Sequence, residues 1–326
     1  MSQAQSSLST AKPFDVITFG ETMALMYPEG SRGLGTTGKL EQSFGGAESN
    51  VAIGLARLGS KVGWFSKIGD DPVGAGIVKT IRGEGVDVSR VRTTSAAPTG
   101  LMLREAVRGK LSVYYYRAGS AASKLTPDDL DHDYIGQTSI LHLTGITPAL
   151  SASCRETAIA AVASAKRQGV KVSFDPNLRL KLWSIDEARP VLLELAAQAD
   201  YFLPGYDELK LLYETEDEAV ILEQLRKLPG ISIVKSVGEE NWIVNGGSVV
   251  KLPFVKADRV VDTVGAGDGF CAGFLSGISR GYTLEQAVRL GGLTGSLVVQ
   301  APGDWEALPT WADAERLLTG ARHIER

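Results

Sequence analysis

Short apolar runs typical of buried strands alternate with longer segments of helical periodicity along most of this chain, and this alternation restricts the fold more than any other feature. Lys171–Asp175 and Ile231–Lys235 are examples of such strands, and Arg155–Gln168 and Ile185–Gln198 are examples of the helices. Alternating helices and short apolar strands build a mostly parallel sheet covered by helices on both faces. The sequence therefore predicts an α/β core. Expected strands lie at 14–20, 62–68, 140–143, 171–175, 201–203, 231–235 and 244–255.

Two β-rich segments, 21–44 and 99–123, interrupt this alternation. The second contains two β-rich runs joined at Arg108-Gly109, which predicts a hairpin turn. We expect the two segments to pair into one small sheet, a lid made of discontinuous sequence over the edge of the core. The core is then formed by residues 14–20, 45–98 and 124–318.

Composition excludes several classes of protein. The chain has 326 residues, 44% of them hydrophobic and 22% charged, with a net charge of −4, which suits a folded protein and argues against binding to nucleic acid. Its two cysteines, Cys154 and Cys271, have no metal-binding spacing and no disulfide pattern. Met1 to Lys12 lacks the basic start and apolar run of a signal peptide, and no stretch of 18 apolar residues follows. We expect a soluble, cytoplasmic protein with no membrane partner.

The most specific motif is Asp262–Gly273, which follows a β-rich stretch and opens a helix. Gly265, Ala266 and Gly267 leave backbone N–H groups unshielded at the helix N-terminus, where they can bind an anion. Asp268 follows in the first turn, and a carboxylate beside an anion site suits a kinase, which needs donors for the phosphoryl group and a base for the attacking hydroxyl. The alternative is structural: Asp268 complements the helix dipole, and the glycines form a tight turn.

Further motifs favour the kinase. Phe44–Asn50, the helix end at Leu58-Gly59 and Lys67–Asp71, together with the later 265–268 motif, resemble the two signatures of the ribokinase-like (phosphofructokinase-B type) sugar kinases. The resemblance extends from about residue 14 to 318. It implies an αβα core with a β lid, ATP as donor with Mg²⁺, and Asp268 as the catalytic base assisted by the backbone of residues 265–267.

Within that family, Tyr114–Ser123, His142–Ala149 and Asp175–Trp183 resemble the 2-keto-3-deoxygluconate kinases. The resemblance implies a small-molecule sugar acid as substrate. The residues that it places in the substrate pocket are Gly46, Tyr115, Arg117, Ile146, Arg179 and Asp304.

Two of these residues also suit an acid sugar on physical grounds. Strand alternation places Tyr115 and Arg117 on one face, and Arg179 lies just beyond the carboxyl end of a strand, where open α/β sheets bind ligands. A guanidinium matches the geometry of a carboxylate, a group that neutral sugars lack. The alternative is that both arginines form surface salt bridges.

The nucleotide side departs from the family pattern. Ile233–Gly238 resembles the strand and turn that meet the nucleotide, but Glu239–Asn241 replaces the usual small continuation. Gly205 stands where the family has an Asn, so only Glu208 remains of the element that influences magnesium. The resemblance implies a metal role for Glu208 and nucleotide contacts for Lys235, Ser236, Gly238, Gly265 and Gly267.

Two other motifs are misleading. Gly33–Leu40 nearly matches a P-loop, yet Leu40 cannot supply the Mg²⁺ hydroxyl and the segment links two lid strands, so we interpret it as a lid turn. Gly277–Gly281 matches a nucleophile elbow in letters, but it ends a helix instead of joining a strand to one.

The sequence thus predicts an ATP- and magnesium-dependent kinase that phosphorylates the terminal hydroxyl of 2-keto-3-deoxygluconate. A kinase for fructose or another neutral ketose is one alternative. A non-catalytic sugar-sensing protein on the same fold is another, against which the intact 265–268 motif argues. The sequence leaves both the gluconate and galactonate epimers open. The exposed lid edge favours a homo-oligomer formed through the lid.

Overall fold

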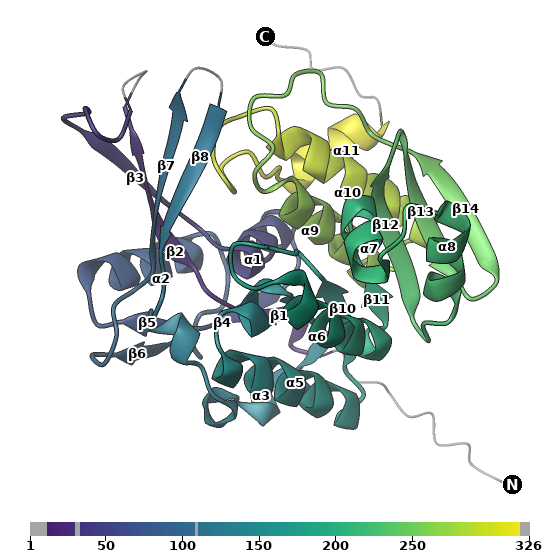
Figure 1. Cartoon of the computed structure of the whole chain (residues 1–326), viewed down its shortest axis with the longest axis horizontal. Helices are drawn as coiled ribbons and strands as arrows, with labels where there is room; N and C mark the ends of the chain where they lie inside the picture. Colours follow the sequence, from purple (N-terminus) through teal and green to yellow (C-terminus); the bar gives the residue numbers. More distant parts are fainter. Residues whose placement is uncertain (1–11, 30–32, 108–109, 320–326) are drawn as a thin grey trace, which may run out of the picture.

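A computed structural model describes residues 12–29, 33–107 and 110–319. The predicted turn at Arg108-Gly109, and Met1 to Ala11, lie outside the described residues. The centre of the molecule is an eight-stranded sheet in the order β14-β13-β12-β11-β10-β9-β1-β4 (Figure 1). Its strands are β1 (Phe14–Phe19), β4 (Val62–Phe65), β9 (Thr138–Thr144), β10 (Lys171–Asp175), β11 (Tyr201–Phe202), β12 (Ile231–Val237), β13 (Glu240–Asn245) and β14 (Ser248–Pro253).

Within this sheet, β4, β1, β9, β10, β11 and β12 are parallel, and β13 and β14 extend it in antiparallel pairing. The connections between the parallel strands carry most of the helices. These are α1 (Ala47–Arg57), α2 (Pro72–Gly83), α3 (His132–Gly136), α4 (Ile146–Ala149), α5 (Ala152–Arg167), α6 (Ile185–Gln198), α7 (Tyr206–Tyr213) and α8 (Glu218–Arg226). Three more helices follow β14: α9 (Ala266–Ser279), α10 (Leu284–Val298) and α11 (Trp311–Thr319).

Both faces of the sheet are apolar because helices cover both of them. In β1, Ile17 joins a cluster with residues of α5, α6, α7 and α8, whereas its neighbour Val16 joins a second cluster with residues of α1, α2, α9 and α10. In β9, Leu141 and Ile140 divide in the same way. Successive side chains of a strand point to opposite faces, so a strand covered on both sides needs a continuous apolar run. This confirms the predicted α/β fold.

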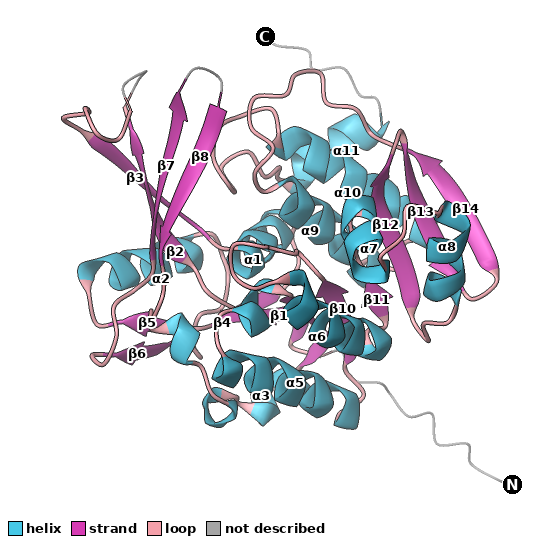
Figure 2. Cartoon of the chain, viewed as in Figure 1, coloured by secondary structure: helices cyan, strands magenta, loops and turns pink. Residues whose placement is uncertain are grey.

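The two β-rich segments pair into a four-stranded sheet in the order β3-β2-β7-β8, which we call the small sheet (Figure 2). Its strands are β2 (Met23–Pro28), β3 (Leu40–Gly45), β7 (Leu101–Val107) and β8 (Lys110–Tyr116). β2 and β7 lie parallel, with Ala24 opposite Leu101, and the two hairpins are antiparallel. The predicted pairing of the two segments is therefore present. That this sheet moves as a lid stays a prediction, as do the domain boundaries.

Three details differ from the sequence prediction. The expected strand 62–68 is divided into β4 and β5 (Lys67–Gly69), and β5 pairs with β6 (Arg92–Thr94) in a separate two-stranded sheet. The expected strand 244–255 is the hairpin of β13 and β14, because Gly246 adopts a positive φ of 53° and turns the chain. The short helix α3, which begins at His132, was not predicted from the sequence.

The topology brings the carboxyl ends of several strands to one edge of the large sheet. β1, β9, β10 and β12 are parallel, so their carboxyl ends meet there, followed by Gly20, Gly145, Pro176 and Gly238. The N-termini of α1 and α9 begin near the same edge, and the small sheet stands beside it (Figure 1). Open α/β sheets bind ligands at this edge. Among the described helices, none is both long and apolar enough to cross a membrane.

Candidate active site

A cleft of about 1340 Å³ lies between the small sheet and the carboxyl edge of the large sheet. It brings together nearly all the residues that the sequence predicted, from widely separated parts of the chain. The predicted residues that line it are Gly46, Tyr115, Arg117, Ile146, Arg179, Glu208, Lys235, Ser236, Gly265, Ala266, Gly267, Asp268 and Asp304.

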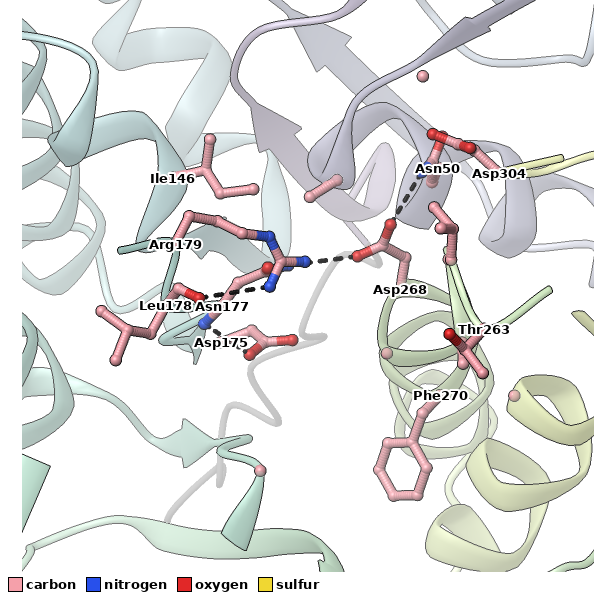
Figure 3. A pocket seen from close by; sticks show the side chains of 18 of the residues that line it. Asn50, Ile146, Asp175, Asn177, Leu178, Arg179, Thr263, Asp268, Phe270 and Asp304 are labelled. Atoms are coloured by element: carbon pink, nitrogen blue, oxygen red, sulfur yellow. Dashed lines mark hydrogen bonds between the residues drawn. The ribbon is translucent and has the colours of Figure 1, made fainter. Parts of the chain in front are cut away.

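Asp268 lies in the first turn of α9 and is 8% exposed. The side-chain amide of Asn50 donates to its Oδ2 at 2.8 Å, and that of Asn177 donates to its Oδ1 at 3.4 Å (Figure 3). Burial raises the pKa of Asp268 to about 7, although the hydrogen bond from Asn50 opposes the shift. A carboxylate with such a pKa can accept a proton near neutral pH.

The turn that precedes this carboxylate is formed by close backbone packing. Gly265, the N-cap of the 14-residue helix α9, has a φ of +78°. A Cβ atom at Gly265 would lie 2.1 Å from the carbonyl oxygen of Asp304. Glycine is therefore required at this position by both conformation and space. The N–H groups of the first turn of α9 have no partners within the helix and can serve as anion donors.

Lys235 places a positive charge beside this turn. Its Nζ lies 3.8 Å from the position that a Cβ of Gly267 would take, and 2.7 Å from Oδ2 of the buried Asp175. Burial alone would lower the pKa of Lys235, but the charge of Asp175 outweighs it, so the pKa is raised. Burial alone would likewise raise the pKa of Asp175, and Lys235 lowers it. Lys235 is thus a charged ammonium beside the N-terminus of α9.

Glu208, predicted to influence magnesium, is engaged by the backbone on both oxygens. Oε1 accepts from the N–H of Leu178 and Oε2 from the N–H of Gly205, each at 2.7 Å. Burial raises the pKa of Glu208, and the charge of Asp175 adds to the shift. No group of three or more metal-ligating side chains is present among the described residues. Glu208 therefore caps the N-terminus of α7, and its metal role stays a prediction.

At the other end of the cleft, Arg117 lies just beyond β8 and over the ring of Tyr115, with its guanidinium carbon 5.6 Å from the ring centroid. The shared face expected for this pair is therefore present. Nε and Nη2 of Arg117 pair with Oε2 of the buried Glu21 at 2.6 and 2.5 Å. Arg117 is thus held in place by an ion pair, and Glu21 offsets its charge.

Arg179 differs from Arg117 in its surroundings. It is exposed and lies opposite Asp268 in the cleft (Figure 3). Its guanidinium makes one hydrogen bond among the described residues, from Nη1 to the carbonyl of Leu178 at 3.4 Å. Its charge opposes the raised pKa of Asp268. Arg179 is therefore the guanidinium with more donors open to a ligand.

The remaining residues that were predicted to bind the sugar also line the cleft. Gly46 is the N-cap of α1, and a Cβ there would lie 2.2 Å from the backbone oxygen of Glu21. Ile146 begins α4. Asp304 is 6% exposed, and burial raises its pKa to about 6 while the nearby Arg104 lowers it. The sequence did not predict this arginine as a partner.

On the nucleotide side, Ser236 lines the cleft and has a φ of +60°, and its N–H donates to Oδ1 of the buried Asn241. Gly238, predicted to contact the nucleotide, does not line the cleft among the described residues. It lies instead in the turn between β12 and β13, with a φ of +58°, beyond an irregular pairing at Val234 and Val237. Described residues 33–40 also stay outside the cleft, as expected for the P-loop-like segment.

Sequence reasoning missed several residues that organise the site. Asn50 and Asn177 hold Asp268, Asp175 holds Lys235, and Glu21 holds Arg117. Asn50 and Asn177 lie within motifs named in the sequence analysis. A polar residue shortly after a strand or near the start of a helix can indicate a functional side chain, so both could have been predicted. Glu21 follows β1 by two residues, but nothing in the sequence links it to Arg117.

Comparison with known proteins places the chain in a family. A model of the pfkB family of carbohydrate kinases matches residues 14–311. The chain belongs to this family. The resemblance inferred from the motifs is thereby confirmed, and so is the ribokinase-like fold.

Individual pfkB relatives match over nearly the whole chain. A 2-dehydro-3-deoxygluconokinase of Bacillus subtilis (strain 168) is 42% identical over 317 residues, which cover 96% of this chain and 98% of the relative. A 2-dehydro-3-deoxygalactonokinase of Haloferax volcanii is 34% identical over 94% of this chain and 97% of the relative. The crystal structure of a PfkB protein from Polaromonas sp. JS666 superimposes with a TM-score of 0.85 at 34% identity, covering 93% of this chain and 99% of that one.

Proposed function

We propose that this pfkB kinase transfers the γ-phosphoryl group of ATP to the terminal hydroxyl of 2-keto-3-deoxygluconate, also called 2-dehydro-3-deoxygluconate. The observation that carries the proposal is a single cleft with a buried carboxylate at a helix N-terminus and two arginines at the sugar end. The relatives named above support it, since both names denote kinases of 2-dehydro-3-deoxy sugar acids.

In the proposed reaction, the terminal hydroxyl oxygen attacks the γ-phosphorus in line. The new O–P bond forms as the bond from the γ-phosphorus to the β,γ-bridging oxygen breaks, and ADP leaves with that oxygen. Asp268 accepts the hydroxyl proton, a role that its raised pKa of about 7 suits. The N–H groups of residues 265–268 and the ammonium of Lys235 stabilise negative charge on the transferring group.

Magnesium would neutralise the phosphates of ATP when bound. Mg²⁺ is usually held by one or two carboxylates, by phosphate oxygens and by water. Asp175 and Glu208 are the carboxylates placed nearest Lys235 that fit this role, because both line the cleft. Asp175 accepts from Lys235, from the N–H of Asn177 and from the thiol of Cys271, and Glu208 accepts from two backbone N–H groups. A carboxylate oxygen can accept more than one hydrogen bond, so both could still bind water held by Mg²⁺.

At the sugar end, we propose that Arg179 binds the carboxylate of the substrate. Its guanidinium makes one long hydrogen bond among the described residues, whereas Arg117 is already paired with Glu21. Arg117 would then orient the sugar together with Tyr115. Closure of the small sheet over the bound sugar would exclude water and limit ATP hydrolysis.

We further propose that two copies pair through the small sheet and that the enzyme works in the cytoplasm. β3 and β8 are both edge strands, and Tyr114 and Tyr116 of β8 are 46% and 63% exposed. An exposed edge strand with aromatic side chains is a template for pairing with another chain. Analytical ultracentrifugation of the wild type and of Tyr116→Lys tests this pairing. We expect a dimeric wild type and a weakened dimer for the variant, and a monomeric wild type would contradict the pairing.

A coupled ADP-release assay over sugar acids and neutral ketoses tests the substrate. We expect the highest kcat/KM with 2-keto-3-deoxygluconate, and a comparison with the galactonate epimer in the same assay resolves the epimer. Turnover of fructose above that of every sugar acid would contradict the proposal. Absence of ADP release with all acceptors would favour a sugar-sensing protein.

A further inference from the structure

A buried arginine connects the small sheet to the turn that begins α9. Arg104 is in β7, is 7% exposed, and its Nη1 donates to Oδ1 of Asp304 at 2.7 Å. The same Nη1 lies 3.4 Å from Oδ2 of Asp262. Both carboxylates are also buried, with side-chain exposures of 8% and 9%. One guanidinium therefore serves two carboxylates from two segments that are distant in the sequence.

Each of these carboxylates belongs to a segment that shapes the turn at Gly265. Oδ1 of Asp262 accepts from the N–H of Val264, which fixes the backbone just before the turn. The carbonyl oxygen of Asp304 packs against Gly265, as its 2.1 Å distance from a Cβ there indicates. Arg104 thus pairs with both segments that support the turn at Gly265.

The small sheet holds the Asp304 segment at further points. Oδ2 of Asp304 lies 2.1 Å from the position of a Cβ on Gly45, at the end of β3. Ser43 donates to Glu306 at 2.5 Å, and the ring of Trp305 stacks on Phe44 at 4.8 Å. The position of the small sheet and the position of this segment are therefore linked.

Charge makes this link sensitive to Arg104. Two buried carboxylates without a cation repel each other, so one of them must take up a proton or move. Burial raises the pKa of Asp304, the nearby Glu306 and Asp262 add to the shift, and Arg104 opposes it. Without Arg104, the cluster would keep three carboxylates and lose the cation that balances them.

Building on the proposed kinase function, we propose that Arg104 is a positioning residue that couples the seating of the small sheet over the cleft to the shape of the anion-binding turn. Arg104 also lines the cleft, but its guanidinium is paired with Asp304 and Asp262, so we expect its effect on the transfer step and not on ATP binding. Seating of the sheet on a bound sugar would hold Arg104, and through Asp262 and Asp304 the backbone donors at Gly265, in their working positions.

A double-mutant cycle tests this coupling. We expect Arg104→Met to lower kcat at least roughly tenfold and to leave the KM for ATP nearly unchanged. Asp262→Asn should lower kcat much less in the Arg104→Met background than in the wild type. The kcat of the double variant should therefore be roughly tenfold higher than the product of the two single effects predicts. Multiplicative effects, or a wild-type kcat for Arg104→Met, would overturn the proposal.

Arg57 provides the matched control. It is half-buried, and it donates to Glu84 and to the carbonyls of Trp305, Glu306 and Leu308. It therefore anchors the same segment from α1, and among the described residues it makes no hydrogen bond to Asp262 or Asp304. We expect Arg57→Met to lower the thermal midpoint and to leave kcat close to that of wild type. A loss of kcat equal to that of Arg104→Met would mean that anchoring the segment is all that matters.

Arg104→Lys is the second variant if Arg104→Met does not fold. Lysine keeps the positive charge but cannot bridge both carboxylates equally well, so we expect a kcat between those of wild type and Arg104→Met, with near-normal stability. A wild-type kcat for Arg104→Lys would overturn the proposal. The cycle can be run with whichever acceptor the wild type uses best. Preference for a neutral ketose would then contradict the substrate assignment alone, and multiplicative mutant effects would contradict the coupling alone.

Discussion

At the phosphoryl end of the cleft, Asp268 is buried and held by the amides of Asn50 and Asn177, whereas at the sugar end Arg179 is exposed and makes one long hydrogen bond among the described residues. The phosphoryl end is preorganised: the turn at Gly265 and the pair of Lys235 with Asp175 are fixed before any ligand binds. The sugar end keeps an unsatisfied guanidinium for the ligand to pair with. In the proposed reaction, buried and fixed side chains would therefore carry out the chemistry, and an exposed side chain would select the substrate.

The largest effect should follow from removing the base at the phosphoryl end. Asp268→Asn keeps the size of the side chain but cannot take a proton, so we expect kcat to fall by roughly 10²- to 10⁴-fold, with a small change in the KM for the sugar. Steady-state ADP release measures both parameters. Near-normal turnover of this variant would remove Asp268 from the role of base.

At the sugar end, Arg179→Leu should raise the KM for the sugar acid by about 10- to 150-fold, the value of a charged hydrogen bond, and leave the KM for ATP nearly unchanged. The ratio of kcat/KM between the acid and a neutral ketose of similar length should narrow, because the neutral sugar does not use the charge. Equal losses for both substrates would mean that Arg179 maintains the shape of the pocket.

Arg117→Leu allows the two arginines at the sugar end of the cleft to be compared. It should also raise the KM for the sugar acid, and in addition it should lower the thermal midpoint, because it leaves the buried Glu21 without its cation. Thermal unfolding of both variants measures the difference. A larger loss of stability for Arg179→Leu would reverse the roles assigned to the two arginines.

A smaller effect should appear in the pH dependence of the phosphoryl end. The base works when ionised, so kcat/KM should rise with pH through the pKa of Asp268, about 7. The hydrogen bond from Asn50 favours the ionised form, so Asn50→Ala should raise this pKa and move the rising limb to higher pH by about one unit. An unmoved limb in a pH–rate profile would mean that another group controls the rate.

The smallest effect should come from the P-loop-like segment. The side chain of Lys39 is 80% exposed and lies 3.9 Å from Glu29, away from the cleft. Lys39→Ala should therefore leave the KM for ATP unchanged within error. A large rise in that KM, with the fold intact, would show a phosphate contact that neither the motif nor the cleft accounts for.

The sequence by itself determined the elements whose signals are local. The short strand-like run Lys171–Asp175 predicted β10, and the helical periodicity of Ile185–Gln198 predicted α6 with its observed bounds. The glycines around Asp268 predicted the anion-binding turn, because their conformational freedom is a property of the residue type. Boundaries failed where a single turn divided an apolar run, as at Gly246 between β13 and β14.

Only the tertiary structure decided which charges are neutralised and which remain available. Glu21 and Arg117 are 96 residues apart, and Arg104 and Asp304 are 200 apart, so no local pattern pairs them. Burial, which sets the pKa of Asp268, likewise arises from the packing of α1 and α9 against the sheet. Local propensity acts over a few residues, whereas the energy of a charge depends on everything within several ångströms in space. The residues that the sequence predicted for the site line the cleft, apart from Gly238, and the fold decided their partners.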